Sequence, residues 1–415
     1  MQKRAKTKFV VGMAAAVLLL TGCGPHKSEQ IDLRVAGQEM GAGESQTAKE
    51  SSEIIIDLPE DHSQESEETQ AETSQEEKEQ EENTQGQVEE TRIGDGDRVL
   101  LFSGDVLLSD HVLSAYQRAG GVSGVLDQGY RSLIAGADYF MVNEEFPFSS
   151  RGTKAADKQY TFRLAPEKVA IFKELGIDAV TLANNHALDY GTDALLDSCE
   201  VLDQAGIART GAGKNLEEAR QPVRIEIGGK KIAVIGATRV IPQADWAASS
   251  SHPGMLATYD PTALLEEIRE QKKENDYVFV MVHWGIERDE RPQEYQRTLG
   301  RQYIDAGADL VIGSHPHVLQ GVEYYQGKAI IYSLGNFIFG SSIPRTALLE
   351  VEVPVSSDGG ELSLRLIPGT SKSGYTQMFT EQNSIQEFAS YIQGISYGAV
   401  IDPNGRVLQG ESCLR

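Results

Sequence analysis

Short apolar runs alternate with amphipathic helical patterns along the chain from Asp97 onward. Runs typical of buried strands lie at residues 99–103, 138–142, 179–183, 231–237, 277–283, 309–313 and 329–334. Patterns typical of helices lie between them at residues 124–135, 165–175, 192–205, 261–274 and 293–306. Regular alternation of strands and helices predicts an α/β fold with much parallel sheet.

The last part of the chain changes to a β pattern. Apolar stretches at residues 347–353 and 361–367 flank a polar, glycine-containing turn at residues 356–360, which predicts a β-hairpin. A helical pattern follows at residues 384–394, and a short strand pair is predicted within residues 400–408. The hairpin belongs either to a second sheet or to an extended edge of the first, so residues 96–415 are predicted to form one domain.

The first 23 residues have the pattern of a lipoprotein signal peptide. Four basic residues within the first eight precede an apolar run at residues 9–20. This run is shorter than the roughly 20 residues that a membrane-spanning helix needs. Leu20-Thr21-Gly22-Cys23 follows, which predicts cleavage before Cys23 and lipidation of that residue. The alternative is an export signal with an unrelated cysteine. We therefore expect the chain on the extracytoplasmic face of the cell membrane, held by a lipid anchor on Cys23.

Residues 24–95 are predicted to be a disordered acidic linker. Positions 24–90 hold twenty Asp and Glu but four Lys and Arg, a net charge of −16 in a chain whose formal net charge is −24. So few apolar side chains do not offset the entropy lost on ordering. We interpret the segment as a spacer. The chain has no basic patch, which argues against nucleic acid as a partner.

Polar side chains follow several predicted strands at their carboxyl ends. The six that carry metal-binding atoms are Asp105, Glu145, Asn185, His283, His315 and His317. Because ligands of open α/β sheets bind where these strand ends gather, we expect the six to converge. Carboxylate, imidazole and amide donors together suit one or two divalent ions of Mn, Zn, Fe or Mg. Taken singly, each residue has a plainer interpretation as a helix cap, a turn residue or a hydrogen-bonded core histidine.

Six short motifs that contain these residues resemble, in the same order, those of the CapA family of poly-γ-glutamate capsule synthesis proteins. They are Ser103-Gly104-Asp105-Val106, Val142-Asn143-Glu144-Glu145, Ala183-Asn184-Asn185-His186-Ala187-Leu188-Asp189-Tyr190-Gly191, His283-Trp284-Gly285-Ile286-Glu287, Gly313-Ser314-His315-Pro316-His317 and Ser333-Leu334-Gly335-Asn336-Phe337. The match runs from about residue 99 to residue 339. This family is similar to calcineurin-like metallophosphatases, so the resemblance implies an α/β/β/α sandwich of two sheets with a metal site at the strand ends.

The resemblance also implies a role for each metal-site residue. Asp105 and His317 would bind one metal ion, His283 and His315 would bind the second, and Asn185 would also be a ligand. Glu145 would stand where the phosphatases have a bridging aspartate.

Three further residues receive roles from the same resemblance. His186 would stabilise an oxyanion or protonate a leaving group, and Asp189 would orient it. Glu287 would either hold substrate amines or form a surface salt bridge.

Two positions depart from the related patterns. The phosphatases have a histidine two residues after the first aspartate, and here that position is Leu107, which removes one ligand from the first ion. The residue before Glu145 is usually leucine in the family and is Glu144 here. Of these two neighbouring carboxylates, we predict that Glu145 is the ligand.

Three functions remain open at this stage. The resemblance implies an accessory protein for poly-γ-glutamate or a related capsule or wall polymer. Its partners would be a polymer synthase complex in the membrane and an anionic polymer or wall substrate. Its chemistry, if any, would be metal-dependent hydrolysis or amide transfer. The alternatives are an extracellular metal-dependent phosphoesterase and a non-catalytic polymer-binding module, and a fold alone does not choose among them.

Overall fold

Residues 97–156, 158–340, 342–355 and 360–411 are described by the computed structural model. The predicted signal peptide with Cys23 and the predicted linker at residues 24–95 lie outside these residues. In the part that is described, no helix is both long enough and apolar enough to cross a bilayer.

The helices and strands follow one another as the sequence pattern predicts, with some additions. The helices are α1 (Asp110–Ala119), α2 (Gln128–Gly136), α3 (Val169–Glu174), α4 (Thr192–Ala205), α5 (Leu216–Ala219), α6 (Thr262–Gln271), α7 (Glu294–Ala306) and α8 (Gln382–Gly394). The strands are β1 (Arg98–Val106), β2 (Tyr139–Glu144), β3 (Ala179–Thr181), β4 (Ala208–Thr210), β5 (Ala212–Gly213), β6 (Val223–Ile227), β7 (Lys230–Thr238), β8 (Gly254–Met255), β9 (Tyr277–His283), β10 (Leu310–Ser314), β11 (Leu319–Tyr325), β12 (Lys328–Leu334), β13 (Asn336–Ile338), β14 (Ser342–Val353), β15 (Ser363–Lys372), β16 (Tyr375–Met378), β17 (Ala399–Ile401) and β18 (Arg406–Gln409).

Two mixed sheets organise the described residues. The larger has the strand order β17-β18-β15-β14-β1-β2-β3-β4, with β13 paired to β1 and β16 paired to β15. Its strands β1 to β4 are parallel, and the predicted hairpin β14–β15 extends it antiparallel from β1. The smaller sheet has the order β11-β12-β10-β9-β7-β6, with β7, β9, β10 and β12 parallel. Short strands β5 and β8 form a separate pair.

The two sheets face each other, and helices cover their outer faces. Leu101 of β1 packs on the helical side with residues of α1 to α4, whereas its neighbours Leu100 and Phe102 point between the sheets. On the smaller sheet, Phe279 points between the sheets while Val280 packs with α6 and α7. Alternate residues of a strand point to opposite faces of the sheet. Because both faces of each sheet are covered, its central strands are apolar at nearly every position.

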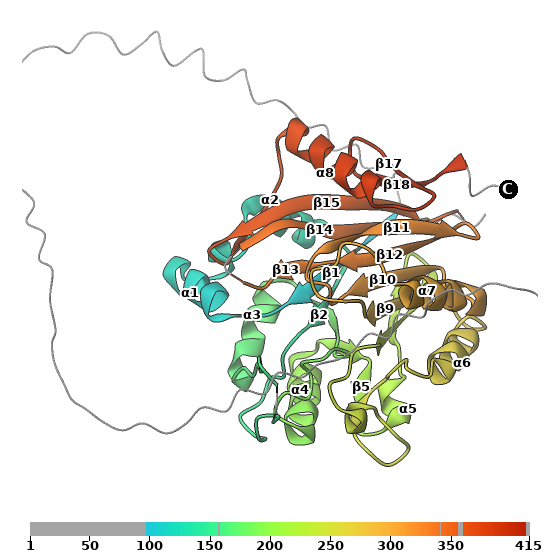
Figure 1. The fold of residues 1–415 in the computed structure, drawn as a ribbon. Helices are drawn as coiled ribbons and strands as arrows, with labels where there is room; N and C mark the ends of the chain where they lie inside the picture. The colour runs from blue at the N-terminus through green and yellow to red at the C-terminus, as the bar shows by residue number, and fades with distance from the viewer. Residues whose placement is uncertain (1–96, 157, 341, 356–359, 412–415) are drawn as a thin grey trace, which may run out of the picture. The chain divides into compact units, whose positions relative to one another are not determined.

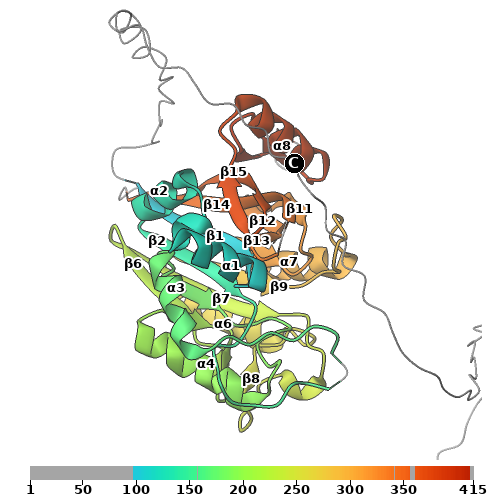
Figure 2. The same cartoon turned by 90° about the vertical axis from the view of Figure 1, so that its left-hand side faces the viewer.

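The helices lie over the sheets in agreement with these apolar clusters. α6 and α7 lie beside β9 and β10, and α8 lies next to β17 and β18 (Figure 1). α1 and α2 lie over β1 and β2 (Figure 2). The predicted α/β sandwich is confirmed, because helices flank two stacked sheets in the order α/β/β/α.

Some elements were not predicted. Helix α1 and strands β6 and β11 are the longest of these. β6 and β11 are antiparallel edge strands of the smaller sheet, so its parallel centre was predicted and its edges were not.

The contact between the sheets generates a stability prediction. Phe102 is fully buried, and its ring meets that of Phe279 edge to face at 5.9 Å between centroids. Phe102→Ala should lower the free energy of unfolding by about 3–5 kcal/mol, because it leaves a cavity between the sheets. Tyr160→Ala is the control, since Tyr160 is 62% exposed, and should change stability by less than about 0.5 kcal/mol. Chemical denaturation of both variants measures the difference, and equal stabilities would contradict this placement of the core.

Candidate metal centre

Asp105 lies at the end of β1, where both of its carboxylate oxygens are bonded. Oδ1 accepts a hydrogen bond from Asn143 Nδ2 at 2.8 Å, and Oδ2 accepts one from the backbone nitrogen of His315 at 3.2 Å. Gly104 allows β1 to reach this position, because a Cβ atom there would lie 1.9 Å from the carbonyl oxygen of Gly335. The first-motif aspartate is thus joined directly to the His315 loop of the other sheet.

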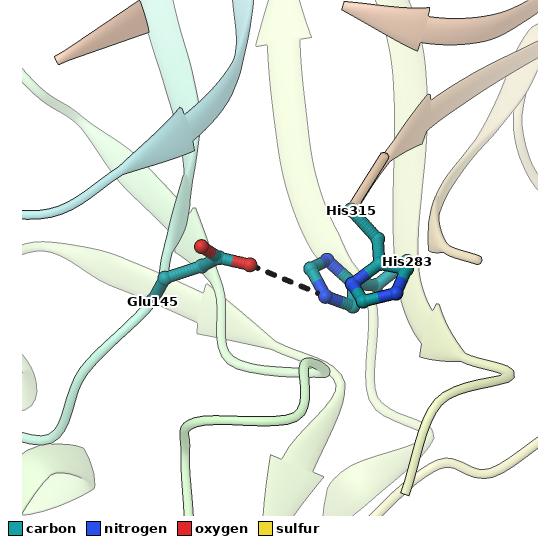
Figure 3. Close-up of side chains that lie close together, drawn as sticks. All are labelled: Glu145, His283 and His315. Carbon is teal, nitrogen blue, oxygen red and sulfur yellow. Dashed lines mark ion pairs between the residues drawn. The ribbon is translucent and has the colours of Figure 1, made fainter. Parts of the chain in front are cut away.

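Glu145 follows β2 and points toward the histidines at the ends of the smaller sheet. Figure 3 shows its carboxylate facing His283 and His315, with Oε1 at 3.2 Å from His283 Nε2. Its neighbour Glu144 points to the opposite side of the strand, where Oε1 accepts a hydrogen bond from Ser198 Oγ of α4 at 3.0 Å. Strand alternation therefore separates the two carboxylates, and Glu145 is the one at the centre.

Two groups of side chains have the geometry of a metal site, and they share one residue. Glu145, His283 and His315 form the first group, and Asp105, Glu145 and His317 form the second. Within each group the available ligand atoms lie within 4.8 Å of one another. A carboxylate common to two such groups is the arrangement that two-metal sites use.

The buried carboxylate of Glu145 is short of partners. It is fully buried, and neither of its oxygens accepts a hydrogen bond in the described structure, although Oε1 lies 3.2 Å from His283 Nε2. His315 Nδ1 is likewise buried without a partner. Burial, reinforced by the charge of Asp105, raises the pKa of Glu145 well above its usual range. Unpaired buried oxygen and nitrogen atoms facing one volume fit a divalent cation, because a cation would compensate the cost of their burial.

Two of the histidines are held in the form that binds metals. Burial, together with the neighbouring charge of His315, lowers the pKa of His283 well below its usual value. Burial and the charge of His317 lower the pKa of His315 to about 4. Both imidazoles are therefore neutral at physiological pH, as a ligand must be. Asn185 also joins this part of the centre, since its Oδ1 lies 2.8 Å from His283 Nε2.

His317 has the opposite electrostatics. Burial lowers its pKa, but the charges of Glu145 and Asp105 outweigh this effect and raise the pKa to about 10. Its Nδ1 lies 3.3 Å from Asp105 Oδ2 and 2.8 Å from Asn336 Oδ1. An ion bound by His317 would displace this proton, because a protonated imidazole has no free lone pair for a metal.

The backbone around the two loop histidines is strained. His315 and His317 have φ values of 99° and 58°, in the left-handed region that residues with side chains rarely adopt. The hydrogen bond from His315 to Asp105 holds this turn in place. Strain of this kind persists only where surrounding contacts impose it, and here it presents both rings from one short loop.

His186 and Asp189 form a pair beside the metal groups. His186 Nδ1 lies 2.7 Å from Asp189 Oδ2. The other carboxylate oxygen of Asp189, Oδ1, is paired with the ammonium group of Lys158. Burial lowers the pKa of His186, although Asp189 opposes this shift. Glu287, in contrast, is exposed on the loop after β9 and belongs to neither metal group.

Sequence reasoning did not identify Lys158. Its ammonium group contacts His186 Nδ1 at 3.0 Å and also the carbonyl oxygen of Asn185. Burial lowers the pKa of Lys158, and Asp189 opposes the shift. A single lysine in a polar loop gives no pattern in the sequence, so nothing marked this position.

The fold and the cluster define the class of the molecule: a two-sheet α/β protein whose carboxylate and histidine side chains meet at the strand ends. Residues 99–341 match the family described as bacterial capsule synthesis protein PGA_cap. The chain therefore belongs to this family, and the resemblance to CapA proteins is confirmed.

The chain is similar in sequence to capsule proteins of two Bacillus species. The chain is 35% identical over 247 residues to the PGA biosynthesis protein CapA of Bacillus subtilis, a match that covers 59% of this chain and 64% of that protein. It is 33% identical over 284 residues to the capsule biosynthesis protein CapA of Bacillus anthracis, covering 65% and 67%. A solved NAD nucleotidase of Haemophilus influenzae is similar over 72% of this chain and 64% of its own, with 12% identity and a TM-score of 0.42.

The orphaned carboxylate generates a prediction on metal content. Glu145→Gln should reduce bound divalent metal to less than about a tenth of the wild-type stoichiometry, because it removes the charge common to both groups. Elemental analysis after dialysis against Mn²⁺ or Zn²⁺ measures this. Glu144→Gln is the matched control: it makes the same change one residue earlier, on the α4 side, and should retain the metal. Equal metal content in the two variants would show that Glu145 is not a ligand.

Proposed function

We propose that this protein acts in the synthesis, export or attachment of poly-γ-glutamate or a related capsule or wall polymer. Membership of the capsule synthesis family supports this proposal, as does the similarity to the PGA biosynthesis protein CapA of Bacillus subtilis. The chain spans 64% of the length of that relative, within the shared domain. The observation that carries the proposal further is Glu145, a buried carboxylate that two groups of metal-binding side chains share.

The proposed chemistry is metal-dependent hydrolysis or transfer at this centre. Asp105, Glu145 and His317 would hold one divalent ion, and Glu145, His283 and His315 would hold the other. When bound, such ions supply Lewis-acid polarisation of a carbonyl or phosphoryl oxygen. The donors are a mixture of carboxylate and imidazole, a set compatible with Mn, Zn, Fe or Mg.

The remaining polar residues would act on the substrate. His186 has its Nδ1 engaged with Asp189, which leaves Nε2 to exchange a proton with a leaving group. Asp189 would position the ring, since the carboxylate fixes its orientation. Lys158 adds a positive charge next to this pair.

We further propose that the protein works at the outer face of the cell membrane. The signal-peptide pattern and Cys23 support a lipid anchor, and the acidic residues 24–95 would act as the spacer between anchor and domain. A polymer synthase complex in the same membrane would be its partner, with the growing anionic polymer as its substrate.

A deletion and complementation experiment tests this function. Removing the protein from its native cell should lower surface-bound poly-γ-glutamate, measured as glutamate released by acid hydrolysis, by at least about ten-fold. Wild type and Glu144→Gln should restore the polymer, whereas Glu145→Gln should not. Unchanged polymer in the deletion strain would contradict the proposed function, and full restoration by Glu145→Gln would contradict the catalytic role of the centre.

Two measurements on the purified chain separate the alternatives. Turnover of a simple phosphodiester with Mn²⁺, abolished in His283→Ala, would identify a phosphoesterase instead. Binding of γ-linked glutamate oligomers with no change in their length after long incubation would identify a non-catalytic binding module.

A further inference from the structure

Arg239 begins a loop at the rim of the metal centre. It directly follows β7, whose last residue Thr238 pairs in register with His283 of β9. The backbone nitrogen of Arg239 donates a hydrogen bond to the carbonyl oxygen of His283 at 2.8 Å. Arg239 therefore lies one strand away from a predicted metal ligand, at the same carboxyl edge of the smaller sheet, although it belongs to neither metal group.

Two tyrosine rings hold the guanidinium group of Arg239. Its Cζ lies 3.7 Å from the ring centroid of Tyr259 and 5.4 Å from that of Tyr295. The Tyr295 ring is held by its hydroxyl, which accepts a hydrogen bond from Gly285 N at 2.8 Å, whereas Tyr259 is exposed and contacts the guanidinium through its ring face. The guanidinium is thus positioned by aromatic faces, an arrangement that cation–π attraction favours.

The hydrogen-bond donors of this guanidinium are free. Among the described residues, its side chain forms no ion pair or hydrogen bond, and its Nη1 is buried without a partner. Other arginines of the protein, such as Arg209 and Arg365, are paired with carboxylates. Several other described arginines also lack an ion pair, but Arg239 combines a missing acid with a buried Nη1 that has no partner and with stacking on two tyrosines. A buried donor without an acceptor costs free energy, and an anionic ligand would remove that cost.

The side chain of Arg239 is half-buried, so its guanidinium is only partly enclosed although Nη1 is buried. The N–H groups of a guanidinium lie in its plane, where they match the two oxygens of a carboxylate. Lys158 cannot supply the same contact, because Asp189 already neutralises it. Arg239 is therefore the cation near the metal centre whose N–H donors are unpaired among the described residues.

We propose that Arg239, held by Tyr259 and Tyr295, is a carboxylate-binding subsite that takes the α-carboxylate of a γ-linked glutamate polymer beside the metal centre. This inference rests on the proposed function. A γ-linked glutamate chain carries one free carboxylate on each residue, and an acidic protein repels such a polyanion everywhere except at fixed cations. Binding at Arg239 would place the neighbouring amide bond of the polymer next to the metal groups.

The test is a binding measurement on the full chain. A γ-linked glutamate oligomer of about ten residues is titrated into wild type and Arg239→Gln by calorimetry, at fixed low salt. Arg239→Gln should weaken binding by at least about ten-fold, the usual effect of losing a charge-assisted bidentate contact. Arg345→Gln is the matched control, because Arg345 also stacks on a tyrosine, Tyr391, at 4.2 Å, and the substitution removes the same charge. It should bind as wild type does.

A second probe keeps the test informative if a variant folds poorly. The same oligomer with its α-carboxylates converted to amides should bind wild type at least about ten-fold more weakly. It should bind Arg239→Gln and wild type almost equally.

Three other outcomes would each contradict a different part of the proposal. If wild type binds the oligomer and Arg239→Gln binds it equally well, the subsite is wrong while polymer recognition stands. If wild type does not bind the oligomer at all, the proposed substrate fails and the inference with it. If a glycerol phosphate oligomer of matched length binds more tightly through Arg239, the ligand is a phosphate polymer and the carboxylate assignment is wrong.

Discussion

A buried glutamate without a hydrogen-bond donor is the constraint on which the centre of this protein depends. Glu145 is fully buried at the strand ends, where an uncompensated charge is costly, and imidazole rings surround it in place of hydrogen-bond donors. Asparagines support the arrangement without joining either group: Asn143 holds Asp105, and Asn184 donates to the backbone oxygen of Glu144. The strained turn at His315 and His317 belongs to the same arrangement, since its geometry brings two rings to one carboxylate.

The fold could be predicted from the sequence where a strand is buried on both faces. The strand predicted at residues 277–283 coincides with β9. An uninterrupted apolar run between two helices indicates a strand that is buried on both faces. Helix α1 was missed because it is short, with ten residues, and buries only Val112 and Ala115. β6 was missed because it has no continuous apolar run: its buried residues Val223 and Ile225 alternate with charged Arg224 and Glu226, as in an edge strand with one exposed face.

The residues of the centre could be proposed from the sequence because each follows a strand, and parallel strands end at one edge. Asp105 and His283 could therefore be predicted to share one volume. This argument could not place Lys158 or Arg239, because a cation in a loop acquires its role from partners far along the chain. For Arg239 the decisive fact is that its side chain has no ion pair among the described residues. A local sequence pattern cannot show that a side chain lacks a partner in the folded protein. The choice of Glu145 over Glu144 rested on the family resemblance, and strand alternation supplies its physical reason.

The hydrogen bond between His315 and Asp105 joins residues 210 positions apart. Half of the ligand set therefore enters the molecule late, with β9 and β10, long after β1 and β2 have been synthesised. An N-terminal fragment that stops before β9 contains the carboxylates and none of the ring nitrogens of His283, His315 and His317. The candidate cluster is therefore incomplete until β9 and β10 have folded against β1 and β2.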